Sequence, residues 1–218
     1  MGVMNFNTQH ILDFLKSSPY PIKLVAVTKS FDLPTTQALI QSGIKVIGES
    51  RVEKAVEKFP HLPVIEKHFI GQIQSKKIKS IVEHFDVIQS VSSNKHLLKI
   101  EAVARVLNKK IEVFLQFNIS GELQKAGYPM GECSGLEGVL MGLNFVQVMG
   151  VMGMASNTSD ESVIRAQFAH LRQRRDELQK KHPSITELSM GMSSDYKIAI
   201  EEGATVLRIG RGLSQPPQ

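Results

Sequence analysis

The residue of this chain best suited to covalent chemistry is Lys29, which follows the apolar, β-branched run Leu24–Thr28. A lysine held in a low-dielectric site beside other cations gives up its proton readily and becomes a nucleophilic amine. The plain alternative is a solvated lysine at the end of a strand, since most lysines lie on protein surfaces. Lys29 alone therefore does not distinguish a covalent site from an ordinary surface charge.

Two segments near the C-terminus have the composition of an anion-binding site. Residues 189–195 read Ser-Met-Gly-Met-Ser-Ser-Asp, and residues 208–212 read Arg-Ile-Gly-Arg-Gly. Glycine lets backbone N–H groups approach an anion closely, and the helix expected after residue 195 would point its N-terminus there. Ser193 can donate a hydroxyl hydrogen bond, and Arg211 can add positive charge. The alternative is that the glycines only form turns.

The elements that position these residues alternate along the chain, with short β-branched runs followed by helical patterns. Most of the runs are apolar on both faces, as parallel strands covered by helices are. The predicted strands are Lys23–Lys29, Lys45–Glu49, His68–Gly71, Asp86–Val91, Ile111–Ile119, Val146–Met154, Glu187–Met190 and Thr205–Gly210. An extra helix over about residues 8–16 is expected before the first strand.

Capping signals mark several of the helices between the strands. Pro34 is suited to the first turn of one helix, and Gly43 is suited to end it. Thr158 and Glu161 form a capping-box pattern before another helix, and Gly203 is expected just after the end of a third.

Eight parallel strands in 218 residues predict an α/β fold, a single (β/α)₈ barrel that occupies the whole chain. A doubly wound open sheet would need a glycine-rich phosphate loop after the first strand, where the chain has Thr28-Lys29-Ser30. In a barrel the active face lies at the C-terminal ends of the strands, and the loops after strands seven and eight often bind phosphate. Lys29 and both glycine-containing segments occupy those places. An amine beside a phosphate site is what a pyridoxal phosphate Schiff base requires.

The composition limits the classes of protein to which this chain can belong. Hydrophobic residues make up 42% of the chain and charged residues 22%, and the formal net charge is +5. Cys133 is the single cysteine, and no signal peptide is apparent, so we expect a cytoplasmic protein. No aromatic residues alternate with the basic ones, so nucleic-acid binding is not expected. No metal-ligand spacing is present, so no metal is expected either.

One stretch resembles a membrane span. Residues 138–159 carry no charge and are long enough to cross a bilayer. They contain Asn144 and Gln147, and the hydrophobic period changes near Leu143. We therefore expect the end of a helix followed by a buried strand, and no membrane association.

A set of motifs in fixed order extends over nearly the whole chain. These are Val25-Ala26-Val27-Thr28-Lys29, Ile47-Gly48-Glu49, His68-Phe69-Ile70-Gly71, Asn118-Ile119-Ser120-Gly121-Glu122, Gly150-Val151-Met152, Leu188-Ser189-Met190-Gly191-Met192-Ser193 with Asp195, and Arg208-Ile209-Gly210. With them the sequence resembles the pyridoxal phosphate homeostasis protein family, which is similar to the N-terminal barrel of alanine racemase.

The resemblance implies a pyridoxal 5′-phosphate cofactor and a set of residues that hold it. It implies a Schiff base at Lys29, phosphate contacts from Ser193, Gly210 and the backbone of Arg211, and an arginine, Arg208, facing the pyridine nitrogen. Arginine is not a proton acceptor at neutral pH, so this contact leaves the ring nitrogen unprotonated and makes the cofactor a weaker electron sink. The full set of expected cofactor-binding residues is Lys29, Ser50, His68, Met192, Ser193, Arg208, Gly210 and Arg211. No residue is assigned a catalytic role.

The chain departs from the usual family pattern in several places. It has Ser50-Arg51 where the family has Asn-Tyr, Lys67 in place of a tryptophan, Phe31 in place of a second lysine, and Arg211 in place of a threonine. The tail after residue 212 is short, and we expect the final helix to be truncated.

The leading functional hypothesis is a monomeric protein that buffers pyridoxal phosphate or delivers it to apoenzymes, without robust catalysis. The first alternative is an amino-acid racemase of the alanine racemase type. Such a reaction needs an acid or base on each face of the cofactor. In those relatives a C-terminal domain supplies the second one, and we expect that domain to be absent here. The second alternative is a barrel that has lost the cofactor and keeps a phosphate pocket.

Overall fold

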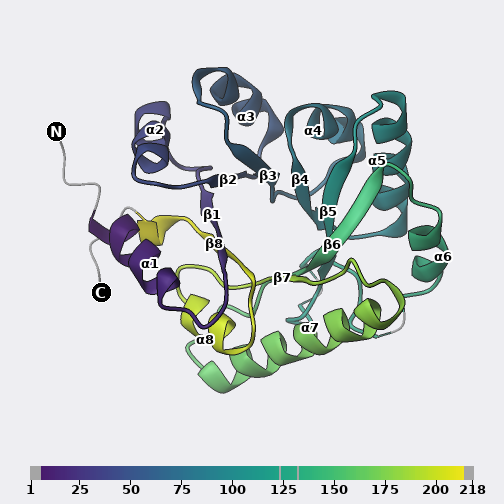
Figure 1. The fold of residues 1–218 in the computed structure, drawn as a ribbon. Helices are drawn as coiled ribbons and strands as arrows, with labels where there is room; N and C mark the ends of the chain where they lie inside the picture. Colours follow the sequence, from purple (N-terminus) through teal and green to yellow (C-terminus); the bar gives the residue numbers. More distant parts are fainter. Residues whose placement is uncertain (1–5, 123, 132, 214–218) are drawn as a thin grey trace.

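A computed structural model describes residues 6–122, 124–131 and 133–213 of the chain. In these residues eight parallel strands close into a barrel in the order β1 to β8 (Figure 1). The strands are β1 (Lys23–Val27), β2 (Val46–Glu49), β3 (Glu66–Phe69), β4 (Val87–Val91), β5 (Ile111–Phe117), β6 (Val146–Gly153), β7 (Glu187–Ser189) and β8 (Val206–Ile209). The predicted (β/α)₈ barrel is confirmed.

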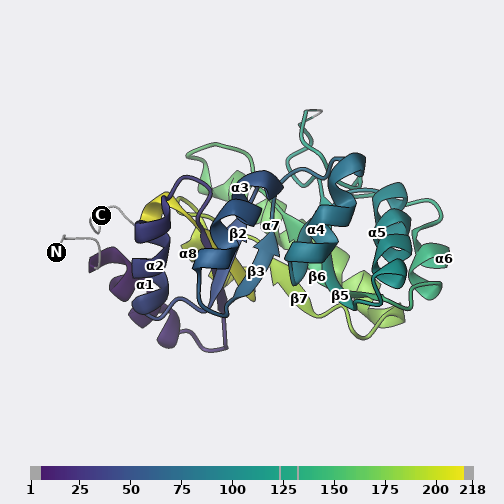
Figure 2. The ribbon, with the colours of Figure 1, turned by 90° about the horizontal axis from the view of Figure 1, so that it is seen from above.

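Helices surround the barrel on its outer side (Figures 1 and 2). They are α1 (Phe6–Lys16), α2 (Leu33–Gln41), α3 (Val52–Lys58), α4 (Ile78–His84), α5 (Asn94–Val106), α6 (Leu136–Met141), α7 (Glu161–Lys181) and α8 (Tyr196–Glu201), with short 3₁₀ turns η1 (Phe59–His61), η2 (Ser75–Lys77) and η3 (Arg211–Leu213). The expected extra helix before the first strand is α1. The shortened tail falls on residues 214–218, outside the described residues, apart from Leu213 in η3.

The predicted helix boundaries are confirmed at α2 and corrected at α7. The Asp32 side chain accepts a hydrogen bond from Thr35 N at the start of α2, Pro34 lies in its first turn, and Gly43 follows its end with φ +106°. At α7 the N-cap residue is Asp160, whose carboxylate accepts from Ser162 N and Val163 N. The capping-box prediction for Thr158 is therefore wrong, because an aspartate closer to the helix satisfies the free N–H groups.

Several strand ends differ from the prediction by one or two residues, and two of these differences move a candidate site residue. Strand β1 ends at Val27, and Phe31 N donates to Thr28 O at 3.1 Å, so Lys29 lies in a turn after the strand. Strand β3 begins at Glu66, so His68 lies inside the strand instead of at its start. Residues 138–159 contain the end of α6 and all of β6, as expected. None of the described helices is long and apolar enough to cross a membrane.

The core has two separate parts. The larger part packs between the strands and the helices. The smaller part fills the inside of the barrel with side chains from six strands, which are Val25, Val46, Val87, Phe114, Met152 and Val206. Because alternate residues of a strand share a face, Gln89 and Arg208, two positions beyond Val87 and Val206, point into the same lumen. The lumen therefore has an apolar level and, nearer the C-terminal ends of the strands, a polar level.

Candidate functional site

The loops that follow β1, β7 and β8 meet at the C-terminal end of the barrel. Gly210 lies against the end of β1, where an added Cβ would be 3.3 Å from the Val27 Cβ. Gly212 N donates to Ser193 Oγ at 3.1 Å, and a Cβ on Gly212 would stand 3.1 Å from that same oxygen. The glycines thus allow the close approach of the two loops predicted to bind phosphate. Lys29, in the turn after β1, belongs to the same end.

The turn after β7 is held by Asp195. Its Oδ1 accepts a hydrogen bond from Met192 N at 2.6 Å, and the residue is 6% exposed. Burial raises the pKa of this carboxyl group, while the Met192 N–H and the positive charge of Arg208 oppose that rise. Helix α8 begins only after this turn and is six residues long. The hydroxyl of Ser193 and the loop N–H groups are therefore better anion ligands here than the helix N-terminus we expected.

Arg208 lies in the lumen and is 4% exposed. Its guanidinium donates to Ser189 Oγ at 2.6 Å and to Gly153 O at 2.8 Å, both neutral oxygens. Burial lowers the pKa of Arg208 to about 10, and the charge of Asp195 acts in the opposite direction. A pKa of about 10 leaves the guanidinium protonated at neutral pH, so it acts as a hydrogen-bond donor.

His68, inside β3, also lies in the lumen and is 1% exposed. Its Nε2 is 2.6 Å from Glu66 Oε1, and its Nδ1 is 2.6 Å from Gln89 Nε2. Burial lowers the pKa of His68, although the hydrogen bond and the charge of Glu66 raise it in part. The histidine is therefore neutral near pH 7, and its hydrogen-bond partners are Glu66 and Gln89.

The other predicted site residues lie at the rim. Ser50 directly follows β2, and its carbonyl oxygen would be 2.1 Å from a Cβ on Gly71, so only glycine fits there. Met192 is half-buried, whereas Arg211 is exposed in η3. Lys29 is exposed as well. The low-dielectric surroundings expected for Lys29 are therefore absent, because the chain turns outward one residue after β1.

The residues that support the Lys29 turn are not evident from the sequence. Glu49, 1% exposed, accepts from Thr28 Oγ1 at 2.7 Å and from Lys58 Nζ at 2.7 Å. Lys58 Nζ donates further to Thr28 O at 2.9 Å and to Phe31 O at 3.1 Å. A buried ion pair thus binds both ends of the turn that carries Lys29. A glutamate at the end of an apolar strand was a usable signal, but Lys58 looks like any other helix lysine.

Helix α1 supports the second loop of the site. Asn7 Nδ2 donates to Gly212 O, and Thr8 Oγ1 donates to Leu213 O at 3.0 Å. Figures 1 and 2 show α1 beside the C-terminal segment at one end of the molecule. The extra helix therefore fixes η3, the turn nearest Ser193.

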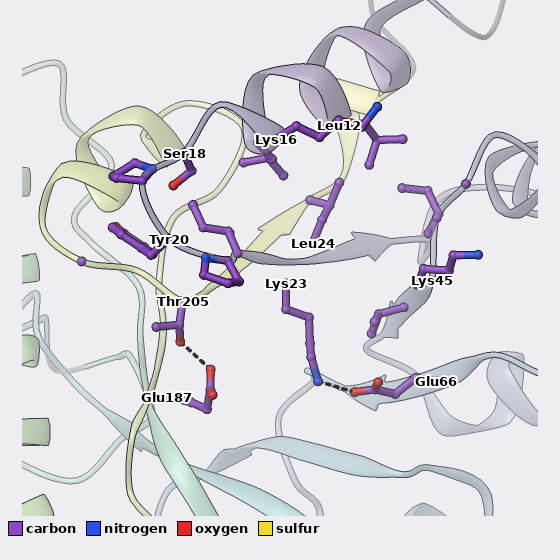
Figure 3. A pocket seen from close by; sticks show the side chains of 18 of the residues that line it. Leu12, Lys16, Ser18, Tyr20, Lys23, Leu24, Lys45, Glu66, Glu187 and Thr205 are labelled. Carbon is purple, nitrogen blue, oxygen red and sulfur yellow. Dashed lines mark hydrogen bonds and ion pairs between the residues drawn. The ribbon is translucent and has the colours of Figure 1, made fainter.

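A large cavity lies at the opposite end of the barrel. It measures about 1230 Å³, and its lining includes Lys23, Glu66, Glu187 and Thr205 (Figure 3). These residues belong to the N-terminal parts of β1, β3, β7 and β8, or directly precede them. The predicted site residues do not occur among the described residues that line this cavity. Its size alone does not make it the reactive site, since the candidate amine Lys29 and the candidate anion ligands lie at the other end.

Comparison with known proteins identifies the family of this chain. Residues 4–214 match the family described as "Alanine racemase, N-terminal domain". A pyridoxal phosphate homeostasis protein of Vibrio cholerae is 32% identical over an alignment of 198 positions that covers 88% of this chain and 84% of that protein. A protein of the same name from Aquifex aeolicus is 33% identical over 86% of this chain and 84% of its own length.

Solved structures of other proteins are also similar to this chain. PipY of Synechococcus elongatus, solved with PLP bound, is 32% identical, covers 96% of this chain and 100% of its own, and superposes with a TM-score of 0.85. Alanine racemase of Clostridium difficile, 15% identical, shares the fold with a TM-score of 0.79 over 98% of this chain and 59% of its own. This chain belongs to the pyridoxal phosphate homeostasis protein family, built on the N-terminal barrel of alanine racemase.

Proposed function

We propose that this chain binds pyridoxal 5′-phosphate at the C-terminal end of its barrel and serves to hold or deliver the cofactor. The observation that carries the proposal is the meeting of three different groups at that end. These are the Lys29 amine, the Ser193 hydroxyl beside η3, and the buried cation of Arg208. An amine, an anion-binding loop and a buried donor match the aldehyde, the phosphate and the ring nitrogen of the cofactor.

The residues present fit the cofactor. The proposed ligands of the anion are the Ser193 hydroxyl, Gly210, and the backbone and charge of Arg211, within one loop pair. The N–H groups of Gly212 and Leu213 already donate to Ser193 Oγ and Gly210 O, so they hold the loops together. Gly210 and Gly212 let these loops approach closely, since an added Cβ would crowd Val27 and Ser193. The residues proposed to bind it are Lys29, Ser50, His68, Met192, Ser193, Arg208, Gly210 and Arg211. Among these, His68 acts indirectly from within the lumen, because Gln89 and Ser189 connect it to Arg208 by hydrogen bonds.

When bound, the cofactor supplies an aldehyde that joins to a primary amine and a ring that withdraws electrons. Lys29 supplies that amine from an exposed turn. Arg208 stays protonated at neutral pH. Its N–H groups can therefore donate a hydrogen bond to the ring nitrogen, but they do not give up a proton to it as a carboxylic acid would. Arg208 thereby keeps the withdrawal of electrons weak, which favours holding the cofactor over using it.

We propose accordingly that catalysis is slight and that apoenzymes receive the cofactor from this protein, which works as a monomer. A racemase needs an acid or base on each face of the reacting carbon. Of the proposed site residues, Lys29 can serve one face, and Arg208 is unsuited to the other because it does not release its proton near neutral pH.

The test combines a spectrum with a proton-exchange measurement. Purified protein mixed with pyridoxal phosphate and then freed of unbound cofactor is expected to stay coloured, and borohydride reduction followed by peptide mapping should place the label on Lys29. In D₂O with L-alanine, NMR should show α-proton exchange far slower than about 1 s⁻¹, a typical lower value for enzymes. A colourless protein would refute cofactor binding. Rapid exchange with inversion would establish a racemase instead.

A further inference from the structure

A chain of polar side chains crosses the lumen from the N-terminal face of the barrel to Arg208. Its members lie on β1, β3, β4, β7 and β8 and are Lys23, Glu66, His68, Gln89, Ser189 and Arg208. The successive distances are 2.9 Å for Lys23 Nζ to Glu66 Oε1, 2.6 Å for Glu66 Oε1 to His68 Nε2, 2.6 Å for His68 Nδ1 to Gln89 Nε2, 2.7 Å for Gln89 Oε1 to Ser189 Oγ, and 2.6 Å for Ser189 Oγ to Arg208 NH1.

The inner members of this chain are buried beside an apolar layer. Gln89 and Ser189 are 0% exposed, and His68 and Arg208 are nearly so. The neighbouring lumen positions hold valine, phenylalanine and methionine side chains. A buried polar group that loses its partner costs about 1–3 kcal/mol, so each member depends on the next for its hydrogen bond. The set is therefore held as one network and not as independent pairs.

The chemistry of the two ends fixes the direction of every bond between them. Arg208 can only donate, so Ser189 Oγ accepts a hydrogen bond from it. The Ser189 hydroxyl then donates its own hydrogen bond to Gln89 Oε1. The Gln89 amide nitrogen is then left facing His68 Nδ1, which must be unprotonated. The remaining proton of His68 lies on Nε2 and points at the Glu66 carboxylate, which can only accept. Burial lowers the pKa of His68, in agreement with this neutral form.

We infer that Gln89 is a positioning residue that orients the Arg208 guanidinium toward the cofactor ring. The inference rests on the proposed function, because it assigns Arg208 to the ring nitrogen. Ser189 Oγ is a small group that can rotate, and its hydrogen bond to the buried amide of Gln89 selects the one orientation in which it accepts from Arg208. The other Arg208 acceptor, Gly153 O, is part of the backbone and fixes the second edge of the guanidinium.

The far end of the chain opens to the N-terminal cavity. Lys23 and Glu66 point toward one another there, as Figure 3 shows, and both line the cavity of about 1230 Å³. The hydrogen bond from His68, with a smaller contribution from Lys23, lowers the pKa of Glu66 to about 2, so its carboxylate stays ionised. Glu66 is thereby a permanent acceptor that keeps the His68 proton on Nε2. The orientation of Arg208 is in this way anchored from the opposite face of the barrel.

The test compares three glutamine variants. Gln89→Met keeps the length of the side chain and removes both hydrogen bonds. Gln89→Glu keeps an acceptor for Ser189 Oγ, and its second oxygen requires His68 to carry a proton on Nδ1 as well as on Nε2. Gln167→Met is the matched control, since the Gln167 amide on α7 also uses both ends, to Ser156 N at 2.8 Å and Ser156 Oγ at 2.8 Å. Each is titrated with pyridoxal phosphate and with the analogue that has carbon in place of the ring nitrogen.

Gln89→Met is expected to weaken binding of pyridoxal phosphate about two- to tenfold, the equivalent of one hydrogen bond, and to shift the absorbance maximum of the bound cofactor. The carbon analogue should lose little affinity, because it offers Arg208 no ring nitrogen. Gln89→Glu should restore the affinity, and Gln167→Met should leave both ligands unaffected. Equal losses for the two ligands, or the same loss in Gln167→Met, would show a merely structural role and overturn the inference.

A measurement on the cofactor-free protein separates this inference from the proposed function. Nitrogen-15 NMR should show the His68 proton on Nε2 and a resolved Arg208 Nε–H signal in the wild-type chain and in Gln167→Met. In Gln89→Met the Arg208 signal should broaden or be lost. An unchanged Arg208 signal, or a His68 proton on Nδ1, would refute the positioning role. If the NMR results are as expected and pyridoxal phosphate does not bind, the proposed function is wrong while the orientation of Arg208 by Gln89 stands.

Discussion

The rim of the barrel and its lumen are both rich in polar residues, but they hold them in opposite ways. At the rim, Lys29, Ser193 and Arg211 are exposed, and their loops are fixed by backbone contacts and by supports from α1 and α3. In the lumen, Gln89 and Ser189 are fully buried and bind other side chains. Replacing an exposed rim side chain leaves the buried core untouched, whereas replacing a lumen side chain leaves a buried polar partner unsatisfied. Substitutions at the rim should therefore change ligand binding, and those in the lumen or beneath the rim should also lower the free energy of unfolding.

The largest effect is expected at the rim, from Lys29→Ala. This variant removes the proposed point of covalent attachment, so the borohydride-trapped adduct should be lost completely. The unfolding midpoint should stay near that of the wild type, because the side chain is exposed. Lys45→Ala is the control, an exposed lysine lining the opposite cavity. A trapped adduct in Lys29→Ala, or its loss in Lys45→Ala, would show that the amine has been assigned to the wrong residue.

Beneath the rim, Lys58→Met should lower the free energy of unfolding by about 3–5 kcal/mol, because it leaves the buried Glu49 carboxylate without its partner. The side chains of Glu49 and Lys58 are 1% and 11% exposed. Denaturant unfolding measures the loss. Glu49→Leu combined with Lys58→Met should recover much of it, since no unpaired charge remains. A single variant as stable as the wild type would mean that the Lys29 turn does not depend on this ion pair.

Ser193→Ala tests the rim again, with a smaller effect that is confined to one part of the ligand. It should weaken binding of pyridoxal phosphate by about 1.5–3 kcal/mol, the value of a hydrogen bond to a charged group. Pyridoxal, which has no phosphate, should bind weakly and respond little to the substitution. Isothermal titration with both ligands measures the difference. The same loss for the two ligands would place the phosphate away from the loop after β7.

The contrast between rim and lumen also explains what the sequence could predict. The strands were predictable because parallel strands covered on both faces are continuous apolar runs, and each ended within a few residues of its predicted position. The loops after β7 and β8 could be recognised because glycine and serine at those places have a chemical meaning. Met192 illustrates the limit, since its N–H is bound to Asp195 and only the structure shows this.

The supports of the site could not be predicted in the same way. Gln89 lies in the apolar-looking run Val87–Val91, and its importance depends on β7 facing it across the lumen. Lys58 is one lysine among many, and its partners lie on other elements. The direction in which Lys29 leaves β1 is set by this tertiary contact, so its exposure did not follow from the buried strand before it. Pairings between distant residues need the barrel closed before they can be identified.

The smallest effect, a pH dependence of stability, probes the lumen alone. Burial lowers the pKa of His68 from its usual value of 6.5. Just below pH 6.5, His68 is therefore protonated in the unfolded chain but stays neutral in the folded lumen. The free energy of unfolding should therefore fall as the pH drops below about 6.5, by at most about 1.4 kcal/mol for each pH unit. Glu66 adds a further loss only as the pH falls from 4.5 toward about 2, where the folded carboxylate is protonated.

Urea unfolding between pH 7.5 and 5.5 isolates the contribution of His68. His68→Gln should flatten the slope in this window, whereas His170→Gln, on the exposed side of α7, should leave it as in the wild type. Partial burial also lowers the pKa of His96, so some slope should survive in His68→Gln. A raised pKa of Asp195 acts only at lower pH, near its usual value of 3.8 and above, and in the opposite direction. If both histidine variants kept the full slope, His68 would not be held neutral by the lumen, and the hydrogen-bond direction assigned from Arg208 to Glu66 would be wrong.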